Sequence, residues 1–182
     1  MATLHRLTVA DLTGLPDDGR YYELLAGEVY QVNSPSEKHQ RASIVGASWL
    51  YQADAAGYGY AYAAPFDVTL DEYNQVQPDL LFVAKERAHI IGEQGIQGPP
   101  DLIIEILSPA TRQRDLTLKR QLYARAGVRY YWLVDPDGET VLCYELDGGG
   151  YRQSAELRGD DVLTSPLFPG LTLPVSRLFA RR

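Results

Sequence analysis

The segment between residues 101 and 135 constrains the possible fold most strongly. It opens with residues 101–107, Asp-Leu-Ile-Ile-Glu-Ile-Leu, and closes with residues 130–135, Tyr-Tyr-Trp-Leu-Val-Asp. Both runs have the length and continuous hydrophobicity of a strand that is buried on both faces. Between them, the pattern predicts a helix from about Arg114 to Ala126 that ends at Gly127. We therefore expect a right-handed crossover between two parallel strands.

The rest of the chain predicts a mixed α/β fold. We expect a helix from about Glu37 to Ala56, which is capped by Ser36 and whose apolar positions at 44, 45, 47, 48 and 51 fit helical spacing. A shorter helix is expected at 8–12. Hairpins are expected at 21–25 with 28–32 and at 140–145 with 151–156, and further strands at 60–70 and 76–83. The segment 86–98 predicts a short helix and loop, and the tail from 168 carries little pattern.

The second helix should be amphipathic. The positions 116, 119, 122, 123 and 126 form one stripe, so we expect Leu116, Leu122 and Tyr123 to be buried and Arg120 and Arg125 to be exposed. Lys119 belongs to the buried stripe, which a lysine with no special role should avoid.

Length and composition fit one globular domain, residues 1–182. The longest apolar runs are far below the roughly 20 residues of a membrane span, and no secretory signal is evident, so we expect a cytoplasmic protein. The single Cys143 excludes an intrachain disulfide. The net charge of −7 argues against a nonspecific nucleic-acid coat protein, although residues 108–129 hold six basic residues and one acidic residue.

Two acids occupy strand positions where acids are costly. Asp79 lies between Pro78 and the apolar run 80–83, and Glu105 lies between two isoleucines. A buried carboxylate must be paired, protonated or metal-bound. Two carboxylates at a strand edge suit Mg²⁺, and a lysine such as Lys119 can orient water and offset transition-state charge. Phosphate-loop, nucleophile-turn and dinucleotide motifs are absent from the sequence.

These residues belong to spaced motifs that resemble a known family. The motifs are Pro65-Phe-Asp-Val, Gln77-Pro-Asp-Leu, residues 100–111 (Pro-Asp-Leu-Ile-Ile-Glu-Ile-Leu-Ser-Pro-Ala-Thr), Asp115 with Lys119 and Tyr123-Ala-Arg-Ala-Gly-Val, and residues 131–136 (Tyr-Trp-Leu-Val-Asp-Pro). In this order they resemble the Uma2 family, a branch of the Pro-Asp…(Asp/Glu)-x-Lys nuclease superfamily. The resemblance covers roughly residues 21–173.

The resemblance implies a restriction-endonuclease-like core: a central mixed β-sheet flanked by two main helices, with added hairpins. It implies that Asp79 and Glu105 bind Mg²⁺ or Mn²⁺ and that Lys119 is the catalytic lysine. Leu107 stands where the superfamily lysine would be, so Lys119 is a relocated lysine. Tyr130 is a second departure, since glutamate would be expected there.

Four further residues are candidates. Glu28, in a segment that resembles the family's Glu-Leu-x-x-Gly-Glu, and His39, near the start of the long helix, are additional site candidates. Arg112 and Arg114 are candidates for contact with DNA phosphates. Each also has a structural explanation, as an edge-strand acid, a helix-end residue or a solvated loop residue.

The sequence thus predicts a metal-dependent endonuclease acting on DNA, with homodimerisation through free strand edges. The alternative is a binding or regulatory module that kept the nuclease fold and lost catalysis, which the acidic composition favours. Glycoside hydrolysis by paired carboxylates ranks last, because no sugar-binding signature accompanies the tyrosines.

Overall fold

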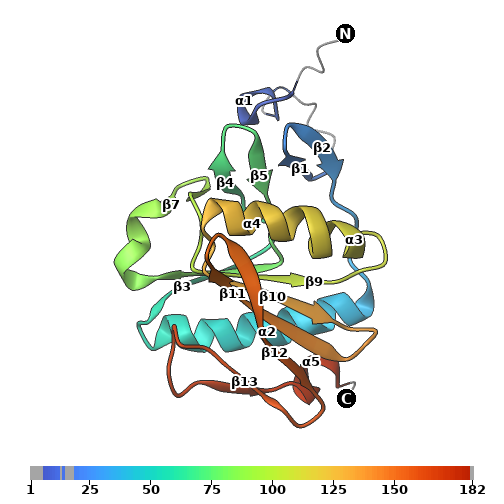
Figure 1. Cartoon of the computed structure of the whole chain (residues 1–182), viewed down its shortest axis with the longest axis vertical. Coiled ribbons are helices and arrows are strands. Elements are labelled where there is room, and N and C mark those ends of the chain that lie inside the picture. The colour runs from blue at the N-terminus through green and yellow to red at the C-terminus, as the bar shows by residue number, and fades with distance from the viewer. Residues whose placement is uncertain (1–5, 13, 15–18, 181–182) are drawn as a thin grey trace.

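A computed structural model describes residues 6–12, 14 and 19–180. Its centre is a mixed six-stranded sheet (Figure 1). In spatial order the strands are β12 (Gly150–Arg158), β11 (Thr140–Asp147), β10 (Tyr130–Asp135), β9 (Leu102–Ile106), β6 (Leu80–Ala84) and β3 (Gly59–Ala63). β9 and β10 are parallel and the other pairs are antiparallel. The predicted parallel crossover and the strand limits at 130–135 are confirmed.

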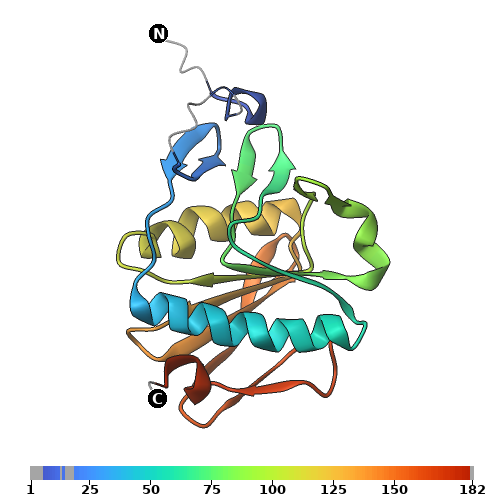
Figure 2. The same ribbon diagram turned by 180° about the vertical axis from the view of Figure 1, so that it is seen from behind.

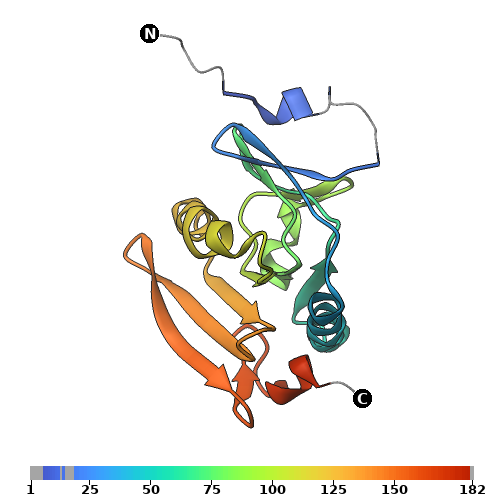
Figure 3. The same ribbon diagram turned by 90° about the vertical axis from the view of Figure 1, so that its right-hand side faces the viewer.

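Helices cover both faces of this sheet, as the edge-on view shows (Figure 3). The long helix α2 (Glu37–Ala55) lies on one face, and Figure 2 shows it in front of the strands. The opposite face is covered by α3 (Arg112–Arg114), a π-helical turn η2 (Asp115–Lys119) and α4 (Arg120–Ala126), which run on from one another. Gly127, with φ of 92°, ends α4 as predicted.

The N-terminal half builds a second six-stranded sheet beside α4. Its spatial order is β2 (Glu28–Gln31), β1 (Tyr22–Leu25), β5 (Asn74–Val76), β4 (Val68–Asp71), β8 (Gly95–Gln97) and β7 (Ile91–Gly92). The predicted first hairpin is confirmed, but the sheet it joins was not anticipated. The expected single strand 76–83 is wrong: Val76 ends β5 in this sheet, and Leu80 begins β6 in the other.

The remaining elements are short. They are α1 (Val9–Leu12), the 3₁₀ helix η1 (Lys85–Ile90), β13 (Val162–Thr164), β14 (Thr172–Pro174) and α5 (Ser176–Phe179). The tail is more ordered than its pattern predicts because Phe168 inserts its ring into the core, 5.0 Å from the ring of Trp49. In the described part of the chain, no helix is both long and apolar enough to cross a membrane.

Two apolar clusters lie on the two faces of the central sheet. One joins α2 to the side chains of Ile104 and Ile106, and the other joins α4 to Ile103 and Leu107. Successive side chains of a strand point to opposite faces. Glu105 therefore faces α4, on the same side as Leu107.

The faces that the two main helices bury differ in part from their hydrophobic spacing. The positions of α2 that fit helical spacing include Ile44 and Tyr51, which are 63% and 68% exposed. The buried positions of α2 are mostly small residues: Ala42, Gly46, Trp49, Leu50 and Ala53. On the second helix, Leu122 and Tyr123 are buried and Leu116 is half-buried, but Arg120 is half-buried rather than exposed, because its guanidinium lies over the ring of Tyr144, 4.5 Å from the centroid.

Candidate active site

The two predicted acids meet where β6 begins and β9 ends. These strands are antiparallel, so Asp79, directly before β6, lies beside Ile106 at the end of β9. Its Oδ2 accepts a hydrogen bond from the backbone N of Ile106 at 2.7 Å. This bond fixes the Asp79 carboxylate against the residue that follows Glu105.

Glu105 is buried under the helix that follows β9. Its side chain is 4% exposed, and its Oε1 accepts hydrogen bonds from Nζ of Lys119 at 3.0 Å and from the hydroxyl of Tyr123 at 2.7 Å. Both bonds end on Oε1, and Oε2 accepts no hydrogen bond from the described residues.

Lys119 occupies the last position of the π-helical turn η2. Such turns widen a helix by one residue and occur often at functional sites. The Lys119 side chain is 4% exposed, and Nζ also lies 2.7 Å from Oε1 of Glu23 and 3.8 Å from Oδ1 of Asp115. The prediction that Lys119 is buried next to the acids is confirmed. Leu107, at the position of the superfamily lysine, lies on the same face of the sheet as Glu105 but carries no charge. The ammonium of Lys119 reaches this face from the helix instead.

Glu23, which we did not predict as a candidate, also contacts Lys119. It lies in β1 with 2% exposure, and its Oε1 accepts hydrogen bonds from Nζ of Lys119 and from the backbone N of Gln77, the latter at 3.0 Å. The segment that resembles Glu-Leu-x-x-Gly-Glu contains both Glu23 and Glu28. The sequence signal that identified Glu105 also applies to Glu23. It is an acid inside a strand, and the next two residues, Leu24 and Leu25, are apolar.

Glu28 does not join the acidic cluster, the group formed by Glu23, Asp79, Glu105, Asp115 and Lys119. It is exposed on β2 and accepts a hydrogen bond from the hydroxyl of Tyr30 at 2.9 Å. No contact links it to Asp79, Glu105 or Lys119 among the residues that the structure describes.

His39, one of the additional candidates, lies at the edge of the acidic cluster, next to Asp79. Its Nε2 is 3.2 Å from Oδ1 of Asp79, and its Nδ1 is buried without a hydrogen-bond partner in the described structure. Burial lowers the pKa of His39, but the hydrogen bond and the charge of Asp79 outweigh burial, so the net shift is upward. With side-chain exposures of 13% for His39 and 19% for Asp79, this edge is more open than the Glu105 side.

The two arginines point to protein partners. Nη1 of Arg112 lies 2.8 Å from Oδ2 of Asp135, although the Arg112 side chain is still 48% exposed. Nη2 of Arg114 lies 3.7 Å from Oε2 of Glu23, and its guanidinium covers the ring of Tyr30. Contact with DNA phosphates stays a prediction for both.

The cluster carries more negative than positive charge. Four carboxylates, Glu23, Asp79, Glu105 and Asp115, surround the cations Lys119 and Arg114 and the titratable His39. The pKa of Glu105 is raised to about 8, because burial and the neighbouring acids, which raise it, outweigh Lys119, which lowers it. Burial also raises the pKa of Asp115.

Lys119 keeps its proton in this setting. Burial lowers the pKa of Lys119, but the charges of Glu105, Glu23 and Asp115 outweigh burial and raise the net pKa above its usual value. The upward pKa shifts of Glu105 and Asp115 show that these carboxylates around a single ammonium favour binding of a proton. A second cation would displace that proton.

The donor set fits a hard divalent cation. In the described chain no three acids, histidines or cysteines are already arranged as a metal site. The buried Oδ1 of Asp115 nevertheless lacks a hydrogen-bond partner there, and Oε2 of Glu105 accepts no hydrogen bond from the described residues. Mg²⁺ prefers oxygen ligands and retains several waters, so one or two carboxylates suffice. The excess negative charge and the open oxygens both suit such an ion.

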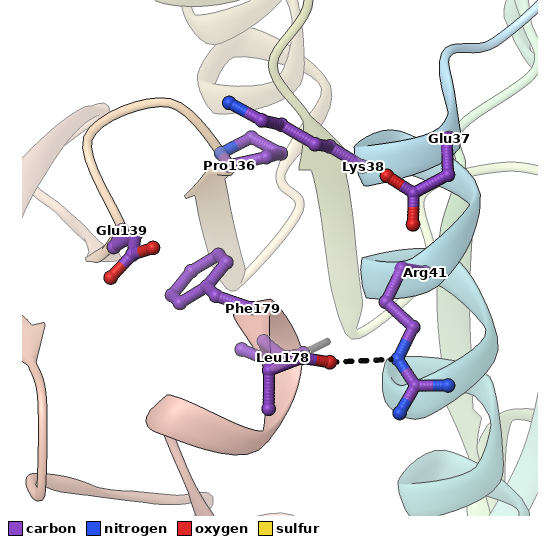
Figure 4. A pocket seen from close by; sticks show the side chains of 8 residues that line it. Glu37, Lys38, Arg41, Pro136, Glu139, Leu178 and Phe179 are labelled. Carbon is purple, nitrogen blue, oxygen red and sulfur yellow. Dashed lines mark hydrogen bonds between the residues drawn. The ribbon is translucent and has the colours of Figure 1, made fainter. Parts of the chain in front are cut away.

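A separate hollow lies beside the N-terminal part of α2 (Figure 4). It has a volume of about 580 Å³, and its walls are formed by α2, the β10–β11 turn and α5. Its lining residues are Glu37, Lys38, Arg41, Pro136, Glu139, Leu178, Phe179 and Ala180. Arg41 donates from Nε to the carbonyl of Ala180 at 3.2 Å. Asp79, Glu105 and Lys119 do not line this hollow, so it is distinct from the acidic cluster.

A mixed sheet between two helices, with two acids at adjacent strand ends and a lysine beside them, defines a restriction-endonuclease-like protein. The chain belongs to the Uma2 family, because the model of that family, described as "putative restriction endonuclease", matches residues 8–176. The fold is similar to the crystal structure of a "putative nuclease belonging to DUF820" from Anabaena variabilis. The TM-score is 0.79 at 23% identity, over 95% of this chain and 97% of that one. No curated protein matches the chain.

Proposed function

We propose that the chain is a metal-dependent endonuclease that hydrolyses phosphodiester bonds in DNA. One observation carries this proposal. The ammonium of Lys119 lies 3.0 Å from Oε1 of the buried Glu105, and the next residue on the strand, Ile106, donates a hydrogen bond to Asp79. Membership of the Uma2 family supports the reaction class. The Anabaena protein named as a nuclease shares the fold.

In this proposal Asp79 and Glu105 hold the metal. Bound Mg²⁺ or Mn²⁺ supplies Lewis acidity, which lowers the pKa of a coordinated water and offsets phosphate charge. His39 orients Asp79 through the contact of Nε2 with Oδ1. The positive end of the site is Lys119, which stays protonated and therefore acts as a hydrogen-bond donor and not as a general base.

The DNA would approach from the side of Asp79 and His39. The other cluster residues, Glu23, Glu105, Asp115 and Lys119, are each 2–3% exposed. Arg112, at the start of α3, has a half-exposed side chain and is our candidate for contact with the DNA backbone. Phosphate contacts of this kind weaken as salt is raised, so binding should fall with ionic strength.

The rival function is a binding or regulatory module without catalysis. The observation that favours it is the depth of the cluster, since Lys119 and Glu105 are covered by α4 and β1. A homodimer is proposed for either function, because Ile44 and Tyr51 leave apolar surface on the outer face of α2. Sedimentation of the wild type and of a variant with both residues changed to Ser tests the dimer.

Nicking of supercoiled plasmid DNA tests the enzymatic proposal. Wild-type protein should convert supercoiled to open-circular DNA in Mg²⁺ or Mn²⁺ and not in chelator. Asp79→Asn and Glu105→Gln should abolish nicking, while Glu28→Gln, a change of the same type at an exposed site, should not. Intact plasmid with every protein in both metals would favour the binding module.

A further inference from the structure

One carboxylate oxygen connects the two halves of the candidate site. Oε1 of Glu23 accepts a hydrogen bond from Nζ of Lys119 at 2.7 Å and another from the backbone N of Gln77 at 3.0 Å. Gln77 lies two residues before Asp79. The same oxygen therefore contacts the catalytic lysine and the segment that delivers the first acid.

Glu23 comes from outside the nuclease core. It lies on β1, in the N-terminal sheet, whereas Glu105 lies on β9 in the central sheet and Lys119 on the helix that covers it. Its second oxygen, Oε2, lies 3.7 Å from Nη2 of Arg114. Arg114 is held in turn over the ring of Tyr30, on the strand paired with β1. Both oxygens of Glu23 are thus restrained by cations from the helix.

Glu23 is buried, and both of its carboxylate oxygens face protein groups: Lys119 and Gln77 at Oε1 and Arg114 at Oε2. Its effect must be exerted through the groups it binds. The ammonium of Lys119 has three protons; one bonds Glu23 and one bonds Glu105, while Asp115 lies beyond bonding range at 3.8 Å. The third proton has no hydrogen-bond acceptor among the described residues.

We propose that Glu23 is a positioning residue that fixes Lys119 and the Gln77–Asp79 segment relative to each other. The proposal rests on the nuclease function proposed above. Without Glu23, Lys119 would turn toward Glu105 and Asp115, and the lead into Asp79 would lose its anchor. A displacement of about 1 Å in a catalytic group can cost about 100-fold in rate. Glu23 would therefore affect kcat and leave substrate binding unchanged.

Steady-state cleavage tests this role. Glu23→Ala should lower kcat about 100-fold with KM within about twofold, because positioning is lost while the DNA contacts remain. Glu23→Gln retains an oxygen that can accept both bonds and should recover most of the loss. Glu28→Ala, the matched change on the paired strand, should leave both constants unchanged. An unchanged kcat in Glu23→Ala, or equal losses in the Ala and Gln variants, would overturn the proposal.

A second measurement needs neither metal nor cleavage. In ¹⁵N-lysine-labelled protein, a buried ammonium held by two carboxylates should give a slowly exchanging NH₃⁺ signal, assigned by its loss in Lys119→Met. We expect the signal to disappear or shift in Glu23→Ala and to persist in Glu28→Ala. An unaltered signal in Glu23→Ala would overturn the positioning role whether or not the wild type cleaves DNA. A wild type without nuclease activity would contradict the proposed function alone.

Discussion

Nζ of Lys119 lies 3.0 Å from Oε1 of Glu105, and both side chains are 4% exposed although 14 residues separate them in the chain. Strand β9 buries the acid, and the crossover helix returns the lysine over the same face of the sheet. The ammonium offsets the buried charge of the acid, and Glu23, 2.7 Å from Nζ, is a second carboxylate bound to the same ammonium. The contact between Lys119 and Glu105 is also the relationship on which the proposed chemistry depends.

Removal of the acid should stop catalysis without unfolding the protein. Glu105→Gln keeps the shape and the acceptor for Tyr123 and removes a buried charge among other acids, so its melting temperature in chelator should equal or exceed that of the wild type. Mg²⁺ should raise the melting temperature of the wild type and not of the variant, because a ligand stabilises the state that binds it. If Mg²⁺ raised the melting temperatures of both proteins equally, Glu105 would not be a metal ligand.

The stability difference between these two proteins should depend on pH. The pKa of Glu105 is raised in the folded state from 4.5 to about 8, so the folded protein holds a proton that the unfolded chain loses. That contribution is full below 4.5 and is lost as the pH rises through 8. Metal-free wild type should therefore lose stability relative to Glu105→Gln between these values. Parallel melting curves across that range would contradict the shift.

Loss of the lysine should be far more damaging than loss of the acid. Lys119→Met leaves Glu23, Glu105 and Asp115 buried around no cation, at a cost of about 3–5 kcal/mol in the free energy of unfolding. Lys38→Met is the control, because Lys38 pairs with Asp137 at the surface, where the two side chains are 50% and 64% exposed. Such exposed pairs contribute about 0–1 kcal/mol. Urea unfolding measures both, and similar losses would argue against a buried ionic cluster.

The packing of the sheet edge makes a prediction of its own. A Cβ on Gly59, the first residue of β3, would stand 2.2 Å from the carbonyl oxygen of Val83 on the paired strand. Gly59→Ala should therefore lower the free energy of unfolding by about 1–3 kcal/mol. Gly150→Ala is the matched control, since its Cβ would meet nothing within 4 Å. Equal stability of the two variants would show that β3 and β6 pair differently.

The central strands could be predicted because their signal is local. The continuous apolar runs of β9 and β10 mark strands buried on both faces, and Gly127 marks the end of the helix between them. Burial on both faces makes an acid conspicuous, and this is why Glu105 could be identified from the sequence.

The inner face of α2 could not be predicted from hydrophobicity. Its contact with the sheet depends on small residues: a Cβ on Gly46 would lie 2.6 Å from Cδ1 of Leu80. Small residues allow close approach yet contribute little to a hydrophobic pattern, whereas the larger Ile44 and Tyr51 face outward. The pattern therefore indicated a helix but not its orientation.

The rest of the site depends on contacts between distant residues. Glu23 is separated from Gln77 by 54 residues and from Lys119 by 96. The break between β5 and β6 is similar: Pro78 has no N–H to donate, and the Asp79 side chain binds Ile106 across to β9. A single sequence carries no signal for such partners.

The most direct measurement of the central claim is anomalous diffraction from crystals soaked in Mn²⁺. We predict a peak within about 2.1 Å of carboxylate oxygens of both Asp79 and Glu105, the distance at which small divalent cations bind oxygen. The same peak should be absent in Glu105→Gln and present in Glu28→Gln. Wild-type crystals without anomalous density at these two acids, or with density only elsewhere, would contradict the assignment of this cluster as the metal-dependent active site.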